Sequence, residues 1–121
     1  MLNDVEWLTN LEKAISIVIK SEDVFADLGA GTGILSILAS KKARKVYSIE
    51  VTLQLYSFGK KIIDTNRLGD KITFLLGDAR LITLPEKVNV IICWMPDLAL
   101  INELQVPVIN HAIEELLADD S

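Results

Sequence analysis

Three glycines, Gly29, Gly31 and Gly33, lie within five residues, directly after a short apolar run at residues 24–28. Glycine has no Cβ, so a loop of this kind can turn tightly and bring its backbone close to a ligand. A helical spacing of apolar residues then begins at Ile34. A buried strand, a glycine loop and a helix in this order predict a parallel α/β sheet, with the loop at the carboxyl edge of its strands.

The rest of the chain continues this alternation of strands and helices. Apolar residues spaced three and four apart predict helices, and short apolar runs predict buried parallel strands. The expected helices cover residues 2–19, 34–42, 53–66 and 107–117, and the expected strands cover residues 24–28, 45–50, 71–76 and 88–93. Residues 81–87 are expected to form an irregular connection. The fold class is therefore α/β, in a single domain that spans residues 1–121.

The order of the strands follows from the handedness of their connections. Right-handed crossovers and a switch point beside the glycine loop predict the order 3-2-1-4, counted along the chain. The fourth strand is then an edge strand, although its nearly continuous apolar sequence is typical of a strand covered on both sides. The short acidic end at residues 118–121 (ADDS) leaves no residues for a fifth strand. We predict either that another chain, such as a second copy in a homodimer, covers this edge, or that the sequence is the front part of a longer protein.

The charge of the chain disfavours one class of partner. Seventeen acidic and 12 basic residues give a net charge of −5, which repels the phosphate backbone of a nucleic acid. Contact with nucleic acid stays possible but is not indicated, because a solvated helix end explains the short basic cluster of Lys41, Lys42, Arg44 and Lys45 more simply.

The cysteine count and the N-terminal sequence indicate a location. The single cysteine, Cys93, can form neither an internal disulfide nor a CxxC zinc site, so we expect a reducing, cytoplasmic environment and no metal site. The first residues are acidic where a signal peptide is basic, and no apolar run approaches the roughly 18 residues of a membrane span. The sequence therefore predicts neither secretion nor membrane insertion.

An acidic residue that follows the glycine loop points to a nucleotide ligand. Glu50 ends the second expected strand about twenty residues after the loop, where an acid can accept hydrogen bonds from ribose hydroxyls. The loop reads G-x-G-x-G, whereas a dinucleotide site uses G-x-G-x-x-G to hold a pyrophosphate. Asp27 makes the mouth of the loop acidic, which favours a ligand with a cationic amino group. These features favour S-adenosylmethionine over NAD; the alternative is a tight turn followed by a solvated acid.

A second acidic residue follows the third expected strand at the same edge of the sheet. Asp78 can accept a hydrogen bond from the exocyclic amine of adenine, while neighbouring backbone and apolar groups such as Ala79 hold the ring. The alternative is an aspartate in an ordinary loop. We keep both Asp78 and Ala79 as candidates for the binding site.

Two segments resemble motifs of a known superfamily. Residues 24–35, VFADLGAGTGIL, are similar to the first motif of class I S-adenosylmethionine-dependent methyltransferases, and residues 46–50, VYSIE, are similar to the second. Within that superfamily the nearest resemblance is to the cofactor-binding core of protein arginine methyltransferases, on residues 1–4, 31–35, 43–46 and 94–95. The resemblance covers nearly the whole chain. It implies a Rossmann-like sheet with flanking helices, in a minimal methyltransferase fold truncated after the fourth strand.

The resemblance also implies the role of each part of the site. The three glycines surround the methionine part of the cofactor, Glu50 binds the ribose, and Asp78 and Ala79 lie near the adenine. Together with the inferences above, the expected S-adenosylmethionine-binding residues are Asp27, Gly29, Ala30, Gly31, Thr32, Gly33, Glu50, Val51, Asp78 and Ala79.

The chain departs from the arginine methyltransferase pattern on the acceptor side. Those enzymes carry an arginine near the start that pairs with the cofactor carboxylate, and residues 5–7 here contain no basic residue. They also hold the guanidinium with two acids, one directly before Trp-Met and one further on. In this chain Cys93 stands in the first position, and only Glu103 resembles the second acid. Arginine is therefore not the expected acceptor. Asp97 and Glu103 are candidate bases and His111 has no evident partner, so no catalytic residue is assigned.

Three functions are compatible with these features. The favoured one is an S-adenosylmethionine-dependent methyltransferase whose acceptor is unidentified and whose acceptor site is completed by a second subunit. The alternative is a non-catalytic module that keeps the same fold for cofactor binding or assembly. A fragment of an NAD-binding oxidoreductase is disfavoured by the glycine spacing.

Overall fold

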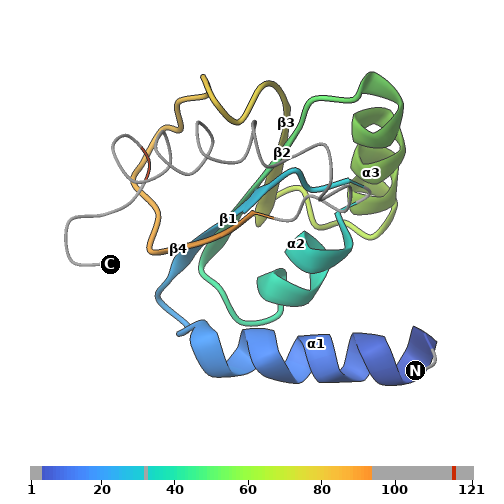
Figure 1. Cartoon of the computed structure of the whole chain (residues 1–121), viewed down its shortest axis with the longest axis vertical. Helices are drawn as coiled ribbons and strands as arrows, with labels where there is room; N and C mark the ends of the chain where they lie inside the picture. The colour runs from blue at the N-terminus through green and yellow to red at the C-terminus, as the bar shows by residue number, and fades with distance from the viewer. Residues whose placement is uncertain (1–3, 32, 94–115, 117–121) are drawn as a thin grey trace, which may run out of the picture.

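The computed structural model describes residues 4–31, 33–93 and 116. The elements follow one another as α1 (Asp4–Val18), β1 (Val24–Leu28), α2 (Ile34–Ser40), β2 (Lys45–Glu50), α3 (Leu53–Thr65), β3 (Ile72–Leu76) and β4 (Val90–Cys93), as Figure 1 shows. Strands β1 and β2 have the bounds that the apolar runs predict. The predicted helix at residues 107–117 lies outside the described residues, except for Leu116.

The strands form one parallel sheet in the order β3-β2-β1-β4, which confirms the predicted order. β1 occupies the interior, where it pairs with β2 on one side and with β4 on the other. In this register Asp27 lies beside Ser48 of β2 and beside Ile92 of β4. Because all four strands run in the same direction, their carboxyl ends meet at one edge of the sheet, where the glycine loop begins.

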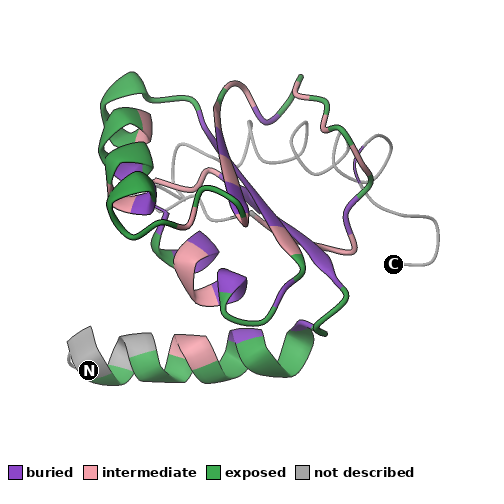
Figure 2. Ribbon diagram, turned by 180° about the vertical axis from the view of Figure 1, so that it is seen from behind, coloured by how far each residue is buried: buried purple, intermediate pink, exposed green. Residues whose placement is uncertain are grey.

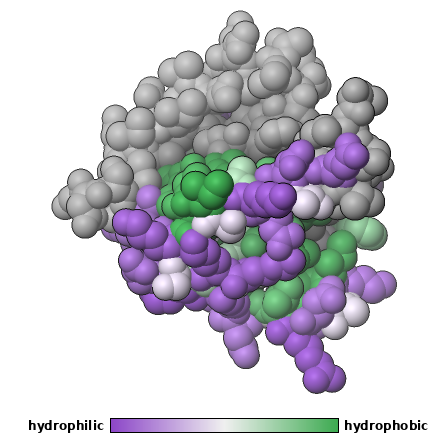
Figure 3. Space-filling view, turned by 90° about the horizontal axis from the view of Figure 1, so that it is seen from below, coloured by the Kyte–Doolittle hydropathy of each residue, from purple (hydrophilic) through white to green (hydrophobic). Residues whose placement is uncertain are grey.

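Helix α1 lies across one end of the molecule. Its outer face is exposed (Figure 2), while Ile15 is buried in the core cluster on the sheet. Figure 3, viewed from the side of α1, shows apolar atoms at the surface among mostly hydrophilic ones; the exposed apolar side chains of this helix include Ile17 and Val18. Within the described part of the chain, no helix combines the length and apolar character needed to cross a bilayer.

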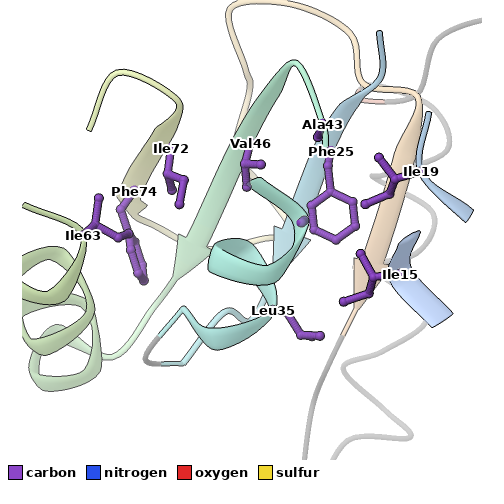
Figure 4. Packing of buried hydrophobic residues seen from close by; sticks show 10 residues of the cluster. Ile15, Ile19, Phe25, Leu35, Ala43, Val46, Ile63, Ile72 and Phe74 are labelled. Carbon is purple, nitrogen blue, oxygen red and sulfur yellow. The ribbon is translucent and has the colours of Figure 1, made fainter. Parts of the chain in front are cut away.

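All three described helices contribute to a core on one face of the sheet. Phe25 of β1 and Val46 of β2 are fully buried there, in one cluster with Leu35 of α2 and Ile63 of α3, which lies beside Phe74 (Figure 4). The opposite face has its own apolar cluster, in which residues of the β3–β4 connection and Leu116 pack on the strands. The buried members of this second cluster are Val24, Ala26, Leu28, Tyr47, Ile49, Ala79, Val88 and Leu116.

The basic cluster at residues 41–45 is engaged within the chain. Lys41 pairs with Glu12 of α1 at 3.0 Å, and the Lys42 ammonium donates to the Ser16 carbonyl at 2.6 Å. Arg44 pairs with Glu86 at 2.7 Å, and Glu86 also accepts a hydrogen bond from Tyr47. The Lys45 ammonium lies 5.6 Å from the centre of the Tyr47 ring. These residues therefore tie α1 to the turn between α2 and β2, and the β3–β4 connection to the start of β2.

The core predicts a clear contrast between two phenylalanines. Phe25→Ala should lower the free energy of unfolding by about 3–5 kcal/mol, because it removes a fully buried ring from the sheet-facing core. Phe58→Ala, at a side chain that is 58% exposed on α3, is the matched control and should change it by about 0.5 kcal/mol or less. Urea unfolding followed by circular dichroism measures both values. Similar losses for the two variants would contradict this packing.

Candidate cofactor site

The glycine loop has the backbone geometry that its sequence predicts. Gly29, Gly31 and Gly33 have φ angles of 77°, 60° and 88°, values that residues with a Cβ rarely adopt. The amides of Gly29 and Ala30 both donate to the Ile49 carbonyl at 2.9 Å, so the start of the loop is fixed to the end of β2. Gly33 is the N-cap residue of α2.

The Glu50 carboxylate joins the loop to the next helix. Its Oε1 accepts a hydrogen bond from the Gly31 amide at 2.7 Å, and its Oε2 accepts one from the amide of Thr52, the N-cap residue of α3, at 2.9 Å. Glu50 is buried, with 6% of its surface exposed. Because each carboxylate oxygen can accept two hydrogen bonds, this arrangement leaves capacity for ligand hydroxyls.

The space around the loop differs between its glycines. A Cβ built on Gly31 meets no heavy atom of the described residues within 4 Å, so this part of the structure leaves the loop open there. A Cβ on Gly33 would approach Cε2 of Phe74 to 3.2 Å. The middle of the loop therefore has room for a ligand against its backbone, whereas its end is packed on the core.

Asp27 lies fully buried one step before the loop. Its Oδ2 accepts a hydrogen bond from the Ser36 hydroxyl of α2 at 2.9 Å, and the Ser48 hydroxyl of β2 donates in turn to Ser36 Oγ. Asp27 Oδ1 is buried without a hydrogen-bond partner among the residues described. Burial raises the pKa of Asp27 to about 6; the hydroxyl of Ser36 opposes this rise and the charge of Glu50 adds to it.

The end of β3 reaches the same edge of the sheet. The Gly77 amide donates to the Glu50 carbonyl at 3.0 Å, which places Asp78 next to the second strand. The guanidinium of Arg80 binds both Asp78 oxygens, with 2.6 Å from Nη2 to Oδ2, and the Arg80 amide donates to Oδ1 at 2.9 Å. This pairing raises the pKa of the exposed Arg80. Asp78 is thus oriented by its own loop.

The structure brings most of the predicted site residues together. Glu50 links Gly31, the start of α3 and the end of β3, while Asp27 lies beneath the loop. Val51 is exposed beside Glu50, whereas the side chain of Ala79 is buried in the second apolar cluster, which leaves its backbone for ligand contacts. Outside the described residues lie Thr32 and the acceptor-side candidates Trp94, Met95, Asp97, Glu103 and His111.

Three residues of this region were not predicted from the sequence. Ser36 and Ser48 interrupt otherwise apolar segments of α2 and β2, and polar residues at such buried positions are the signal that could have identified them. Arg80 follows Asp78 by two residues, a spacing that carries no comparable signal.

Known proteins share this architecture. Residues 6–107 match the TRM5/TYW2 methyltransferase domain. The chain belongs to this family. It is 42% identical over 114 residues to the uncharacterized protein MJ1452 of Methanocaldococcus jannaschii, and this match covers 94% of the chain and 44% of that protein.

Two solved structures resemble the methyltransferase domain closely. The Trypanosoma brucei PRMT1 enzyme-prozyme heterotetrameric complex with AdoHcy has a TM-score of 0.79 at 31% identity, over 97% of this chain and 38% of that one. Methanocaldococcus jannaschii Trm5 in complex with adenosine has a TM-score of 0.68 at 28% identity, over 84% of this chain and 32% of that one. The chain therefore spans less than half the length of the relatives it matches.

These matches confirm the predicted superfamily, fold and cofactor class. The methyltransferase domain has the Rossmann-like sheet of the class I S-adenosylmethionine-dependent superfamily, and both the arginine methyltransferase and the Trm5 branches share it. S-adenosylmethionine, favoured over NAD by the spacing of the loop, is the cofactor of this superfamily.

Burial of Asp27 predicts a pH dependence of stability. Its pKa is about 6 in the folded chain against 3.8 as its ordinary value, so its ionisation opposes folding. The stabilisation from the protonated form is complete below pH 3.8 and is lost as the pH rises through 6. The loss amounts to about 3 kcal/mol, from the two-unit difference in pKa. Asp27→Asn cannot titrate and should gain stability relative to the natural chain across this window.

Urea unfolding of both proteins between pH 4 and pH 8 measures this difference. Other carboxylates titrate in both proteins alike, so the difference between the two curves isolates Asp27. Parallel curves would show that Asp27 has an ordinary pKa.

Proposed function

We propose that this chain binds S-adenosylmethionine between the glycine loop, Glu50 and the end of β3, and transfers its methyl group to an acceptor. The observation that carries the proposal is the Glu50 carboxylate, which is buried at the end of β2 and bonded to the Gly31 amide at 2.7 Å. This bond holds the carboxylate, which can accept hydrogen bonds from ribose hydroxyls, beside the backbone of the loop. The family to which the domain belongs supports the same reaction.

The residues present suit the chemical groups of this cofactor. Open space at Gly31 admits the ligand against the backbone, without a Cβ in the way. Among the described residues each Glu50 oxygen accepts one hydrogen bond, which leaves lone pairs for the ribose hydroxyls. Asp27 Oδ1 has no partner among the same residues and can accept from the cationic amino group. Gly29, Ala30 and Gly33 complete the proposed contacts of the loop.

The adenine ring lies, in this proposal, between Val51 and the segment after β3. Val51 follows Glu50, is 67% exposed and offers an apolar surface to the ring. In this proposal Asp78 accepts a hydrogen bond from the exocyclic amine of adenine, and the backbone of Ala79 borders the ring.

The reaction needs positioning more than acid–base chemistry. When bound, S-adenosylmethionine supplies an electrophilic methyl group on a positively charged sulfur. The acceptor must lie in line with the bond from that sulfur to the methyl carbon, and holding it there supplies much of the rate enhancement. The acceptor site lies beyond β4, which follows β1 on the side of the sheet away from β2. A base is required only for acceptors that lose a proton.

A non-catalytic cofactor-binding module is the alternative outcome of the same fold. The absence of a basic residue at positions 5–7, and the cysteine in place of the first acid of the arginine methyltransferase loop, favour this alternative. An assay of methyl transfer from S-adenosylmethionine to a range of acceptors distinguishes the enzyme from the module, because the module binds the cofactor without turnover.

We further propose that a second copy of the chain covers the outer edge of β4. Among the described residues, β4 pairs only with β1 and is the last strand on its side of the sheet. An unpaired parallel strand edge exposes amides and carbonyls that favour pairing with another chain. The single cysteine supports the cytoplasm as the location of this assembly.

The ribose contact is tested by removing the Glu50 carboxylate. Glu50→Ala should weaken S-adenosylmethionine binding by about 1–3 kcal/mol, because buried hydrogen bonds to the ribose are lost. Calorimetric titration of the folded variant measures the affinity, with NAD as the ligand control. Glu86→Ala is the matched control variant, since Glu86 bonds Arg44 and Tyr47 away from the loop. Equal affinities for Glu50→Ala and the natural chain would refute the ribose assignment.

The edge of β4 predicts the oligomeric state. Light scattering over a range of protein concentrations should give the mass of two chains, because pairing at this edge buries the open side of the sheet. A stable monomer at high concentration would rule out pairing through β4.

A further inference from the structure

Two buried hydroxyl groups lie against the acid beneath the glycine loop. Ser48 of β2 is the register neighbour of Asp27 on β1, and Ser36 lies in the first turns of α2, which packs on the same face of the sheet. The side chains of Asp27, Ser36 and Ser48 are all fully buried. Burying a polar group costs free energy unless the group is hydrogen-bonded. Packing alone therefore does not explain three polar side chains at these positions.

The hydroxyls form a chain with a defined direction. Ser48 donates to Ser36 Oγ, and Ser36 donates to Asp27 Oδ2 at 2.9 Å. A hydroxyl that accepts one hydrogen bond becomes a stronger donor, so Ser48 strengthens the bond from Ser36 to the carboxylate. Both hydroxyls therefore fix the Asp27 rotamer and favour its ionised form.

The arrangement uses one Asp27 oxygen and leaves the other without a described partner. Oδ1 is buried, and a buried acceptor left unpaired is costly until a donor reaches it. The groups facing Asp27 from the neighbouring elements are Ser36 of α2, Ser48 and the acidic Glu50 of β2, and the apolar Ile92 of β4. None of these facing groups is a cation, so a cationic ligand group, directly or through one water, is the donor that balances this site.

We propose that Ser36 and Ser48 are positioning residues for cofactor binding: their hydroxyl chain holds Asp27 so that Oδ1 receives the amino group of S-adenosylmethionine. This inference rests on the proposed function, since it assumes that the cofactor binds at the glycine loop. It goes further by assigning two residues of α2 and β2 that do not touch the ligand.

The first test follows the Asp27 carboxyl group in the free, full-length chain. Carbon NMR should show that Ser36→Ala raises the midpoint of the Asp27 titration by about one pH unit, because a hydrogen bond to the ionised form is lost. The double variant S36A/S48A should raise it at least as far, since it prevents Ser48 from replacing Ser36 as the donor. Ser40→Ala is the matched control: Ser40 is a buried serine of the same helix, and its hydroxyl bonds the Ile37 carbonyl.

The second test measures S-adenosylmethionine affinity by calorimetry at pH 6 and pH 8. A one-unit rise in the midpoint predicts that S36A binds about fivefold more weakly than the natural chain at pH 6 and almost equally at pH 8. Because both proteins bind the same ligand, the ratio of their affinities at each pH does not depend on the titration of the ligand. Ser36→Thr keeps a hydroxyl and should restore the affinity at pH 6.

The possible results separate the two proposals. An unchanged Asp27 midpoint in both serine variants, or the same loss of affinity at pH 6 and pH 8, would overturn the positioning role and leave only a packing role. If the natural chain bound no S-adenosylmethionine at either pH, the proposed function would fail. The titration of the free chain would then still show whether the hydroxyls control Asp27.

Discussion

The Glu50 carboxylate holds together the part of the molecule on which the site depends. One oxygen binds the Gly31 amide and the other binds the Thr52 amide, while the carbonyl of the same residue accepts from Gly77. A single side chain and its backbone thus connect the glycine loop, the start of α3 and the end of β3. Because these segments are far apart in the sequence, their common attachment to the end of β2 is what makes them one site rather than three loops at a sheet edge.

This attachment brings two acids into one buried region. Asp27 and Glu50 repel each other, and burial alone already disfavours the charge on Asp27. A fold selected for stability alone would place apolar residues here, since an unpaired buried charge opposes folding. In the proposed complex the cationic amino group pairs with Asp27 and the ribose hydroxyls donate to Glu50, so bound cofactor offsets the cost of burying both acids. On this proposal, the instability of the free site and its affinity for the cofactor have the same physical origin.

The sequence predicts the framework of this molecule better than its side-chain networks. The strand order follows from the handedness of the connections, and Glu50 follows from its place at the end of an apolar run. Ser36 and Ser48 could not be paired from sequence, because their contact depends on how α2 lies over β2. The Asp78–Arg80 pair likewise depends on the turn after Gly77, where Arg80 folds back on both carboxylate oxygens. Periodicity predicts which face a residue occupies, but not which polar neighbour it meets there.

The position of the site within the sheet explains how one domain can resemble both Trm5 and an arginine methyltransferase. Asp27, the glycine loop, Glu50 and Asp78 all lie on or directly after β1, β2 and β3, so the proposed cofactor site needs no residue of β4. The requirements of the cofactor constrain these strands in the same way whatever group receives the methyl. In the proposed function the acceptor is held outside these three strands. Likeness over the first three strands is therefore evidence for the cofactor and carries little information about the acceptor.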